Sequence, residues 1–244
     1  MNTKLYPESG VELTPFIAKY YDWVMNIASL GWYRKFISKA ISDLSVDPSD
    51  SILDLGCGTG RNASLMLSYL GHNGKITGVD LSPDMQAQFE QHFANENRVN
   101  FKQQRIDVPF DLGEKYDIVF ISFVIHGFPH EVRSTIIENA KRHLKPCGYF
   151  VILDFAEFDR IKMPYLHRLI FEKIECPYAF DFIKRDWNSI LNGYCLETVT
   201  EYFYVKNYVR LLKTQLSVRS EKSKTPKSPE GDFEEFIDFQ RVPL

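Results

Sequence analysis

Residues 52–60 read Ile-Leu-Asp-Leu-Gly-Cys-Gly-Thr-Gly, an apolar run that passes directly into a glycine-rich loop. The ten residues that follow, 61–70, have their apolar side chains at helical spacing. Glycine lets the backbone turn tightly and leaves bare amide groups at the start of a helix, where a ligand can lie against them. The stretch therefore predicts a strand, a ligand-binding loop and a helix.

Downstream of this unit, short apolar runs alternate with amphipathic runs. Strands are predicted at 52–55, 75–79, 99–103, 116–122 and 149–154, and helices at 61–70, 83–94 and 131–144. This alternation is typical of a parallel sheet that is covered by helices on both faces. Period-two runs at 196–204 and 208–216 add an antiparallel hairpin at one edge. The predicted fold class is α/β, with a Rossmann-like sheet of seven strands.

Composition divides the chain into three regions. Residues 1–50 carry aromatic and aliphatic residues at helical spacing and predict an N-terminal helical cap, broken around Gly31. Residues 51–216 form the main domain, in which residues 155–192 interrupt the strand–helix rhythm as an insertion. From Ser217 the sequence turns to Ser, Lys, Pro and Glu, which predicts a disordered tail over 217–244 with an acidic and aromatic end.

Charge and cysteine content restrict the class of protein. The 244 residues carry a formal net charge of -3, which argues against sequence-independent binding of nucleic acid. No apolar run approaches the roughly 20 residues that span a bilayer, and the N-terminus lacks the pattern of a signal peptide. Four cysteines without a C-x-x-C pair indicate neither a metal site nor a disulfide framework. We therefore expect a cytoplasmic protein without a membrane segment, a nucleic-acid partner or a metal.

Two carboxylates near the loop indicate which ligand it binds. Asp80 ends the second strand twenty residues after Gly60, where a carboxylate can accept both hydroxyls of a ribose. Asp54 lies beside the loop, where it attracts a cationic amino group and repels a diphosphate. The glycine spacing also departs from the dinucleotide pattern G-x-G-x-x-G. These features favour S-adenosylmethionine as cofactor, with a nicotinamide-dependent dehydrogenase as the disfavoured alternative.

On these residues the chain resembles the class I S-adenosylmethionine-dependent methyltransferases. The likeness rests on Asp54–Gly60 with Asp80, on Tyr116–Phe120 as the fourth strand, and on Leu144–Phe150 before the fifth. Within the class, Lys19–Asp22 and Leu30–Tyr33 resemble the entry segment of the ubiquinone/menaquinone-biosynthesis C-methyltransferases. The resemblance implies the seven-stranded class I methyltransferase sheet and methyl transfer to a small molecule.

The resemblance also implies a set of cofactor-binding residues. In the family an Asp usually ends the third strand and contacts adenine, but here Arg105 occupies that position and Asp107 follows two residues later. Two possibilities remain open, adenine contact by Asp107 or by the backbone with Ile106. The expected cofactor-binding residues are Tyr21, Asp54, Gly56, Gly58, Gly60, Asp80, Leu81, Ile106, Asp107 and Ser122.

The candidate catalytic residue is His126, because it follows the fourth strand at the edge where open α/β sheets bind ligands. A general base is needed only where the methyl acceptor has a proton to lose. The alternative is that His126 caps the next helix. His130 lies four residues on, but Gly127 and Pro129 break the helix that a zinc pair would need. Asp154, at the end of the fifth strand, either binds substrate or is a solvated carboxylate.

The insertion at residues 155–192 is rich in aromatic side chains and lies where similar enzymes build a lid over the substrate. An aromatic lid suits a small, apolar or aromatic acceptor, although aromatic residues are also ordinary core residues. The predicted function is methyl transfer from S-adenosylmethionine to such an acceptor. The alternative is a non-catalytic protein that binds the cofactor or S-adenosylhomocysteine and serves in interaction or regulation.

Overall fold

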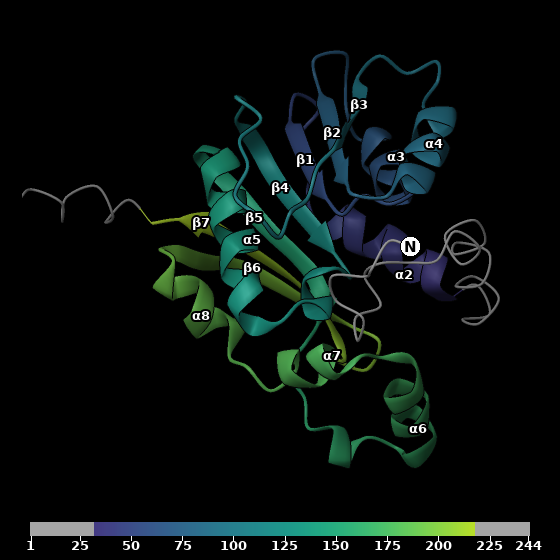
Figure 1. Ribbon diagram of the computed structural model, residues 1–244, viewed down its shortest axis with the longest axis vertical. Coiled ribbons are helices and arrows are strands. Elements are labelled where there is room, and N and C mark those ends of the chain that lie inside the picture. The colour runs from purple at the N-terminus through teal and green to yellow at the C-terminus, as the bar shows by residue number, and fades with distance from the viewer. Residues whose placement is uncertain (1–31, 218–244) are drawn as a thin grey trace, which may run out of the picture.

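In the computed structural model, which describes residues 32–217, the chain forms one sheet of seven strands in the order β3-β2-β1-β4-β5-β7-β6 (Figure 1). Strand β7 runs antiparallel to both β5 and β6, and the other neighbouring strands are parallel. The expected sheet and its edge hairpin are thus confirmed. The strands are β1 Ser51–Leu55, β2 Lys75–Asp80, β3 Val99–Gln103, β4 Tyr116–Ser122, β5 Leu144–Phe155, β6 Leu196–Tyr204 and β7 Val209–Leu216.

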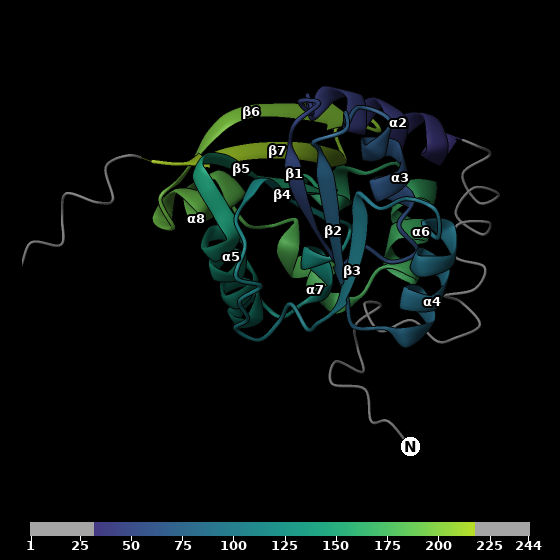
Figure 2. The same ribbon diagram turned by 90° about the horizontal axis from the view of Figure 1, so that it is seen from above.

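Helices cover both faces of this sheet (Figure 2). One face carries α2 Trp32–Asp43, α3 Arg61–Leu67 and α4 Pro83–His92, and the other carries α5 His130–His143 and α8 Trp187–Gly193. The short helix η1, Ile125–Gly127, follows β4. Helices α6 Tyr165–Ile174 and α7 Pro177–Phe182, with η2 Arg160–Lys162, lie beyond the end at which the parallel strands finish (Figure 1).

The central strands are predominantly apolar because they are buried on both faces. In β4, Val119 and Ile121 belong to the core under α5 and α8, whereas Ile118 and Phe120 belong to the core under α2, α3 and α4. Burial on two faces removes the alternation of polar and apolar residues that a half-exposed strand shows. The continuous apolar runs of the sequence are therefore the direct signature of this double cover.

Two element boundaries differ from the prediction by more than two residues. The helix after the glycine loop ends at Leu67 rather than residue 70, because its last amides turn to carbonyls three residues back, as Ser68 does to Leu65. Strand β5 begins at Leu144, which pairs with Tyr116 across an irregularity in the register. Apolar spacing does not distinguish a tightened last turn from helix, nor a bulged strand start from loop.

The remaining predictions on organisation fall mostly on residues that the structure does not describe. Of the predicted N-terminal cap, α2 is described, and Tyr21 lies outside the described residues. The predicted tail also lies outside them, apart from Ser217. Among residues 32–217, no helix has the length and the apolar character needed to cross a membrane.

The first testable prediction concerns Gly60, the left-handed residue that begins α3. Its φ is +84°, and a Cβ atom there would lie 2.5 Å from Phe93 and 2.8 Å from Phe89. Gly60→Ala therefore adds both backbone strain and a clash in the core, and should lower the free energy of unfolding by about 2–4 kcal/mol.

Chemical denaturation of the full chain measures this loss. Gly113→Ala is the matched control, because Gly113 has a φ of +70° but nothing within 4 Å of the added Cβ. The control should lose only about 1 kcal/mol from the strained backbone. Equal losses in the two variants would contradict the packing role of Gly60.

Candidate functional site

The glycine loop is hydrogen-bonded to the neighbouring strand β2. The amides of Gly56 and Cys57 both donate to the carbonyl of Val79 in β2, at 2.7 and 3.0 Å. Gly56 also lacks room for a side chain, because a Cβ would lie 2.7 Å from Val124. The loop is thus held in a fixed shape at the edge where β1, β2 and β4 end.

Gly58 is the position at which the loop leaves open space. Its φ is +54°, and the nearest atom to an added Cβ would be the sulfur of Met85, 4.0 Å away. Gly56 and Gly60 are constrained by packing, but Gly58 has no comparable neighbour within the described residues. Its backbone is therefore available to lie against a ligand.

Asp54 is a buried carboxylate with an unused oxygen. Its side chain is 1% exposed, and Oδ2 has no hydrogen-bond partner among the described residues. Burial, and then the charge of Asp80, raise the pKa of Asp54 to about 7. An unpaired buried charge is costly, so this oxygen is a site at which a ligand cation or donor would be strongly favoured.

Asp80 lies at the end of β2 and holds the loop in place. Its Oδ2 accepts from the amide of Gly58 at 3.0 Å, and its Oδ1 accepts from the amide of Ser82 at 2.9 Å. Burial raises the pKa of Asp80, and these amide donors partly oppose the shift. Each carboxylate oxygen can accept a second bond, and the neighbouring Leu81 is 44% exposed, which leaves an apolar surface beside the carboxylate.

This donor set fits the cofactor expected from the sequence. The unpartnered Oδ2 of Asp54 matches an ammonium group, the remaining acceptor capacity of Asp80 matches a pair of hydroxyls, and the open backbone at Gly58 allows close approach. Ser122 ends β4 at the same edge of the sheet. The structure therefore brings Asp54, Gly58, Asp80 and Ser122 to one edge, as the sequence predicted.

The loop after β3 shows a more constrained arrangement than the sequence indicated. Both oxygens of Asp107 accept from Arg105, at 3.0 and 2.7 Å, and Ile106 is buried with 6% exposure. Asn139 of α5 binds this loop by donating to the carbonyls of Ile106 and Val108. Sequence reasoning missed Asn139, because an amide inside a helical pattern carries no local signal of a contact about thirty residues away.

His126 forms the second part of the site. It lies in η1, and its Nδ1 is 2.7 Å from Oδ1 of Asp154 in β5. Asp154 is 1% exposed and also accepts from the amide of Phe155. The hydrogen bond favours the tautomer that carries its proton on Nδ1, which leaves the lone pair on Nε2. A histidine oriented in this way by a buried carboxylate is suited to accept a proton.

The second ring nitrogen of His126, Nε2, faces the insertion. It lies 3.5 Å from Oε2 of Glu175, the residue that follows α6. Burial by itself lowers the pKa of His126, but the charge and hydrogen bond of Asp154 and the charge of Glu175 outweigh it, so the pKa is raised above 6.5. Burial raises the pKa of Glu175, against the opposing effect of His126.

Two alternatives from the sequence are wrong. His126 does not cap α5, because the N-cap position belongs to Pro129 and no side chain within residues 32–217 caps that helix. Asp154 is not a solvated carboxylate, because it is buried against His126. The described residues contain no group of three or more His, Cys, Asp or Glu side chains placed to hold a metal.

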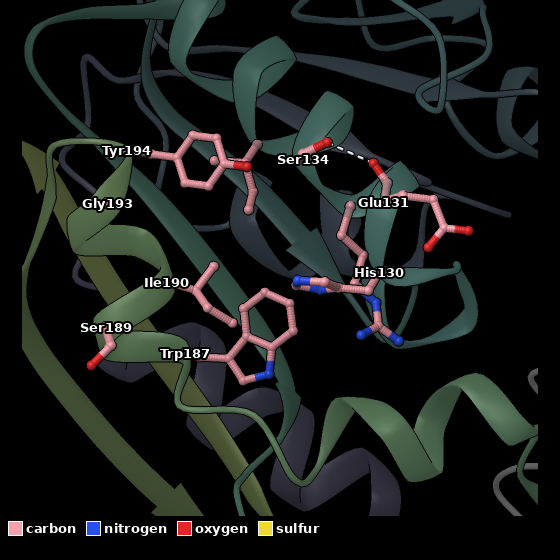
Figure 3. A pocket seen from close by; sticks show the side chains of 10 residues that line it. His130, Glu131, Ser134, Trp187, Ser189, Ile190, Gly193 and Tyr194 are labelled. Carbon is pink, nitrogen blue, oxygen red and sulfur yellow. Dashed lines mark hydrogen bonds between the residues drawn. The ribbon is translucent and has the colours of Figure 1, made fainter.

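A hollow of about 340 Å³ lies elsewhere, between α5 and α8. Figure 3 shows His130, Glu131 and Ser134 on the α5 side, across from Trp187, Ile190 and Tyr194 of the α8 segment. None of the residues that line it is among those predicted from the sequence to bind the cofactor, and His126 does not line it. Among the described residues, those predicted from the sequence to bind the cofactor or to act in catalysis therefore lie outside this hollow.

The chain resembles known methyltransferases in sequence. Residues 52–148 match the model of a family described as "Methyltransferase domain". The chain is 27% identical over 197 residues to the chloroplastic 2-phytyl-1,4-beta-naphthoquinone methyltransferase of Arabidopsis thaliana, an alignment that covers 75% of this chain and 74% of that enzyme. It is 29% identical over 164 residues to the demethylmenaquinone methyltransferase of Lactobacillus johnsonii, covering 64% of each.

Solved structures agree on the fold. A SAM-dependent methyltransferase from Aquifex aeolicus superposes with a TM-score of 0.60 at 16% identity, over 84% of this chain and 100% of that one. The glycopeptide N-methyltransferase MtfA in complex with S-adenosylmethionine gives a TM-score of 0.56 at 15% identity, over 75% and 94% of the two chains. At these identities the likeness establishes the fold and leaves the substrate open.

The second prediction follows from the burial of Asp54. In the unfolded chain its pKa is about 3.9, whereas in the folded protein it is raised to about 7. The folded state thus loses stability relative to the unfolded state as the pH rises from about 4 to above 7. Asp54→Asn removes this cost, and should raise the free energy of unfolding of the ligand-free protein at pH 8 by about 2–4 kcal/mol.

Denaturation curves at pH 5 and pH 8 measure the effect, which should shrink at the lower pH. Asp84→Asn is the control, because Asp84 is an exposed carboxylate on α4. An Asp54→Asn variant that is less stable than the parent at pH 8 would show that burial of the charged carboxylate does not lower the free energy of unfolding.

Proposed function

Because the chain belongs to the S-adenosylmethionine-dependent methyltransferases, we propose that it methylates a small, apolar or aromatic acceptor with His126 as general base. The observation that carries the proposal is the 2.7 Å contact between Nδ1 of His126 and the buried Asp154, at the edge that also holds the glycine loop. The names of the plant and bacterial relatives, a naphthoquinone and a demethylmenaquinone methyltransferase, support a small acceptor.

The proposed cofactor contacts follow from the hydrogen-bonding capacity that Asp54 and Asp80 leave unused at the sheet edge. Oδ2 of Asp54 pairs with the ammonium group, and Asp80 accepts the ribose hydroxyls while keeping its bonds to Gly58 and Ser82. The exposed side chain of Leu81 packs on the adenine ring, which has an apolar face. The other residues proposed to line the cofactor are Tyr21, Gly56, Gly60, Ile106, Asp107 and Ser122.

The chemistry assigned to the chain's own residues is orientation, exclusion of water and one proton transfer. S-adenosylmethionine, when bound, supplies an electrophilic methyl group on a sulfonium centre. Asp154 holds the imidazole so that Nε2 presents its lone pair, and Nε2 accepts the proton that the acceptor loses as it attacks. Asp154 then stabilises the imidazolium, as a buried carboxylate does in other histidine pairs. Alignment of the reactants supplies most of the remaining rate enhancement.

Aromatic side chains of the insertion support an apolar or aromatic acceptor. The ring of Phe155 lies 5.0 Å from that of His126, and Phe171 lies 5.2 Å from Phe155. Phe180 continues the group at 5.6 Å from Phe171, and Phe182 lies 6.4 Å from His126. Phe171 and Phe182 are buried in the core, whereas Phe155 and Phe180 are only partly buried and are proposed to offer an apolar surface to a planar, poorly hydrated molecule.

The third prediction concerns the cofactor. Calorimetric titration should show that the chain binds S-adenosylhomocysteine and not NAD. Asp80→Ala should weaken S-adenosylhomocysteine by about 2–4 kcal/mol, because it removes charged hydrogen-bond acceptors. Glu90→Gln, on the exposed side of α4, is the control and should leave the affinity unchanged. Binding of NAD in place of S-adenosylhomocysteine would contradict the proposal.

The fourth prediction concerns His126. With labelled cofactor and a panel of short-chain hydroquinones and phenols, the accepted compound should gain one methyl group, identified by mass spectrometry. His126→Ala should then lower kcat by roughly 10²–10⁴-fold and leave S-adenosylhomocysteine affinity nearly unchanged. The rate should rise with pH through the pKa of His126, which Asp154 and Glu175 raise above 6.5, because the base acts only when neutral.

Asp154→Asn provides the second arm of this test. Loss of the buried negative charge lowers the pKa of His126, so the rise of rate with pH should move to lower pH while kcat falls. An unchanged kcat in His126→Ala at saturating acceptor would remove the histidine from the mechanism and leave alignment as the whole contribution of the protein.

A further inference from the structure

Arg133 of α5 is a fully buried charge that the proposed chemistry does not use. Its side chain is 1% exposed. Its Nε donates to the carbonyl of Ile125 at 3.2 Å, and Nη2 donates to the carbonyl of His126 at 3.1 Å. Both acceptors belong to η1, so the guanidinium is bonded to the backbone on which His126 stands.

The same guanidinium is bonded to the insertion. Nη2 donates to the carbonyl of Tyr178 at 2.7 Å, and Nη1 donates to Oδ2 of Asp181 at 2.8 Å, both in α7. It also lies 5.1 Å from the centre of the Phe182 ring and 5.7 Å from that of Trp187. One side chain thus joins the turn of His126 to α7 and to the start of α8.

The position of Glu175 in the chain connects the bonds of Arg133 with Nε2 of His126. Glu175, which faces Nε2 of His126 at 3.5 Å, stands just before α7 begins at Pro177. The segment that carries Glu175 is therefore anchored, three residues further on, by the bond between Arg133 and Tyr178. A shift of α7 relative to η1 would change what surrounds the nitrogen that is proposed to take the proton.

We propose that Arg133 is a positioning residue that locks the insertion to the turn carrying His126, so that the base and the segment around it move as one unit. The inference rests on the proposed role of His126. Five donors in a fixed fork allow an arginine to bind several carbonyls and a carboxylate at once, whereas a lysine ammonium is a compact point charge that cannot span them. Burial of the charge is tolerated because Asp181 and three carbonyls satisfy it.

The charge of Arg133 also acts on the imidazole. The charged groups that face His126 among the described residues are Asp154 from β5, Glu175 from the segment after α6 and Arg133 from α5. The two carboxylates raise the pKa of His126 and Arg133 lowers it. Removal of the guanidinium charge should therefore raise the pKa of His126, an effect that loss of packing alone does not produce.

The experiment uses the full chain without cofactor or acceptor, so that its outcome is independent of the methyl-transfer assay. NMR titration of isotope-labelled histidine gives the pKa of His126, whose signal is identified by its loss in His126→Gln. Amide hydrogen exchange followed by mass spectrometry gives the opening rate of residues 175–183. In Arg133→Met we expect the pKa of His126 to rise and exchange in 175–183 to become roughly tenfold faster or more, since charged hydrogen bonds to α7 are lost.

Arg133→Lys separates the two effects and serves where Arg133→Met does not fold. It keeps the charge and loses most of the hydrogen bonds, so the pKa of His126 should stay near that of the parent while exchange in 175–183 still quickens. Arg142→Met is the matched control, because Arg142 lies on the same helix and its guanidinium donates to the carbonyl of Phe110 rather than to η1 or α7. Exchange in 175–183 that stays at the parent rate in Arg133→Lys, or a pKa of His126 in Arg133→Met equal to that in Arg142→Met, would overturn the proposal.

Discussion

The parallel pairing of β1 with both β2 and β4 is the constraint on which the site depends. In register, Asp54 lies opposite Gly78 of β2 on one side and Phe120 of β4 on the other. Because the three strands run the same way, the glycine loop, Asp80 and the turn of His126 all emerge at one edge. Two carboxylates and a histidine that are separated by up to 72 positions in the chain are thereby placed at one edge of the sheet.

Asp54 and His126 at this edge are titratable groups whose pKa values are shifted from their ordinary values by burial and by neighbouring charges. Among the described residues, Oδ2 of Asp54 has no hydrogen-bond partner, and burial together with the charge of Asp80 raises the pKa of this carboxyl to about 7. His126 has a partner at each ring nitrogen: the buried carboxylate of Asp154 lies against Nδ1, and Glu175 faces Nε2. Sites of this kind give up stability in order to bind a charged ligand or to move a proton.

The insertion between β5 and β6 packs against His126 through Glu175 and Phe182. The ring of Phe182 approaches His126 from this segment, and helix α7 is bonded through Arg133 to the turn that carries His126. The sheet and its glycine loop are features that the chain shares in outline with its relatives. The segment that surrounds Nε2 is where acceptor choice would be decided, because it supplies the side chains that contact whatever lies against that nitrogen.

The sequence by itself determined the order of the strands and helices, the glycine loop, and the placement of Asp54, Asp80 and His126 at strand ends. These features depend on local rules, namely apolar periodicity, the conformational freedom of glycine and the common direction of parallel strands. The tertiary structure alone decided that Asp154 orients His126, that Glu175 faces Nε2, that Asn139 holds the loop after β3 and that Arg133 joins α7 to η1. Each of these contacts joins residues between seven and 49 positions apart in the chain and depends on how the helices and the insertion pack on the sheet, and no pattern within one segment encodes that packing.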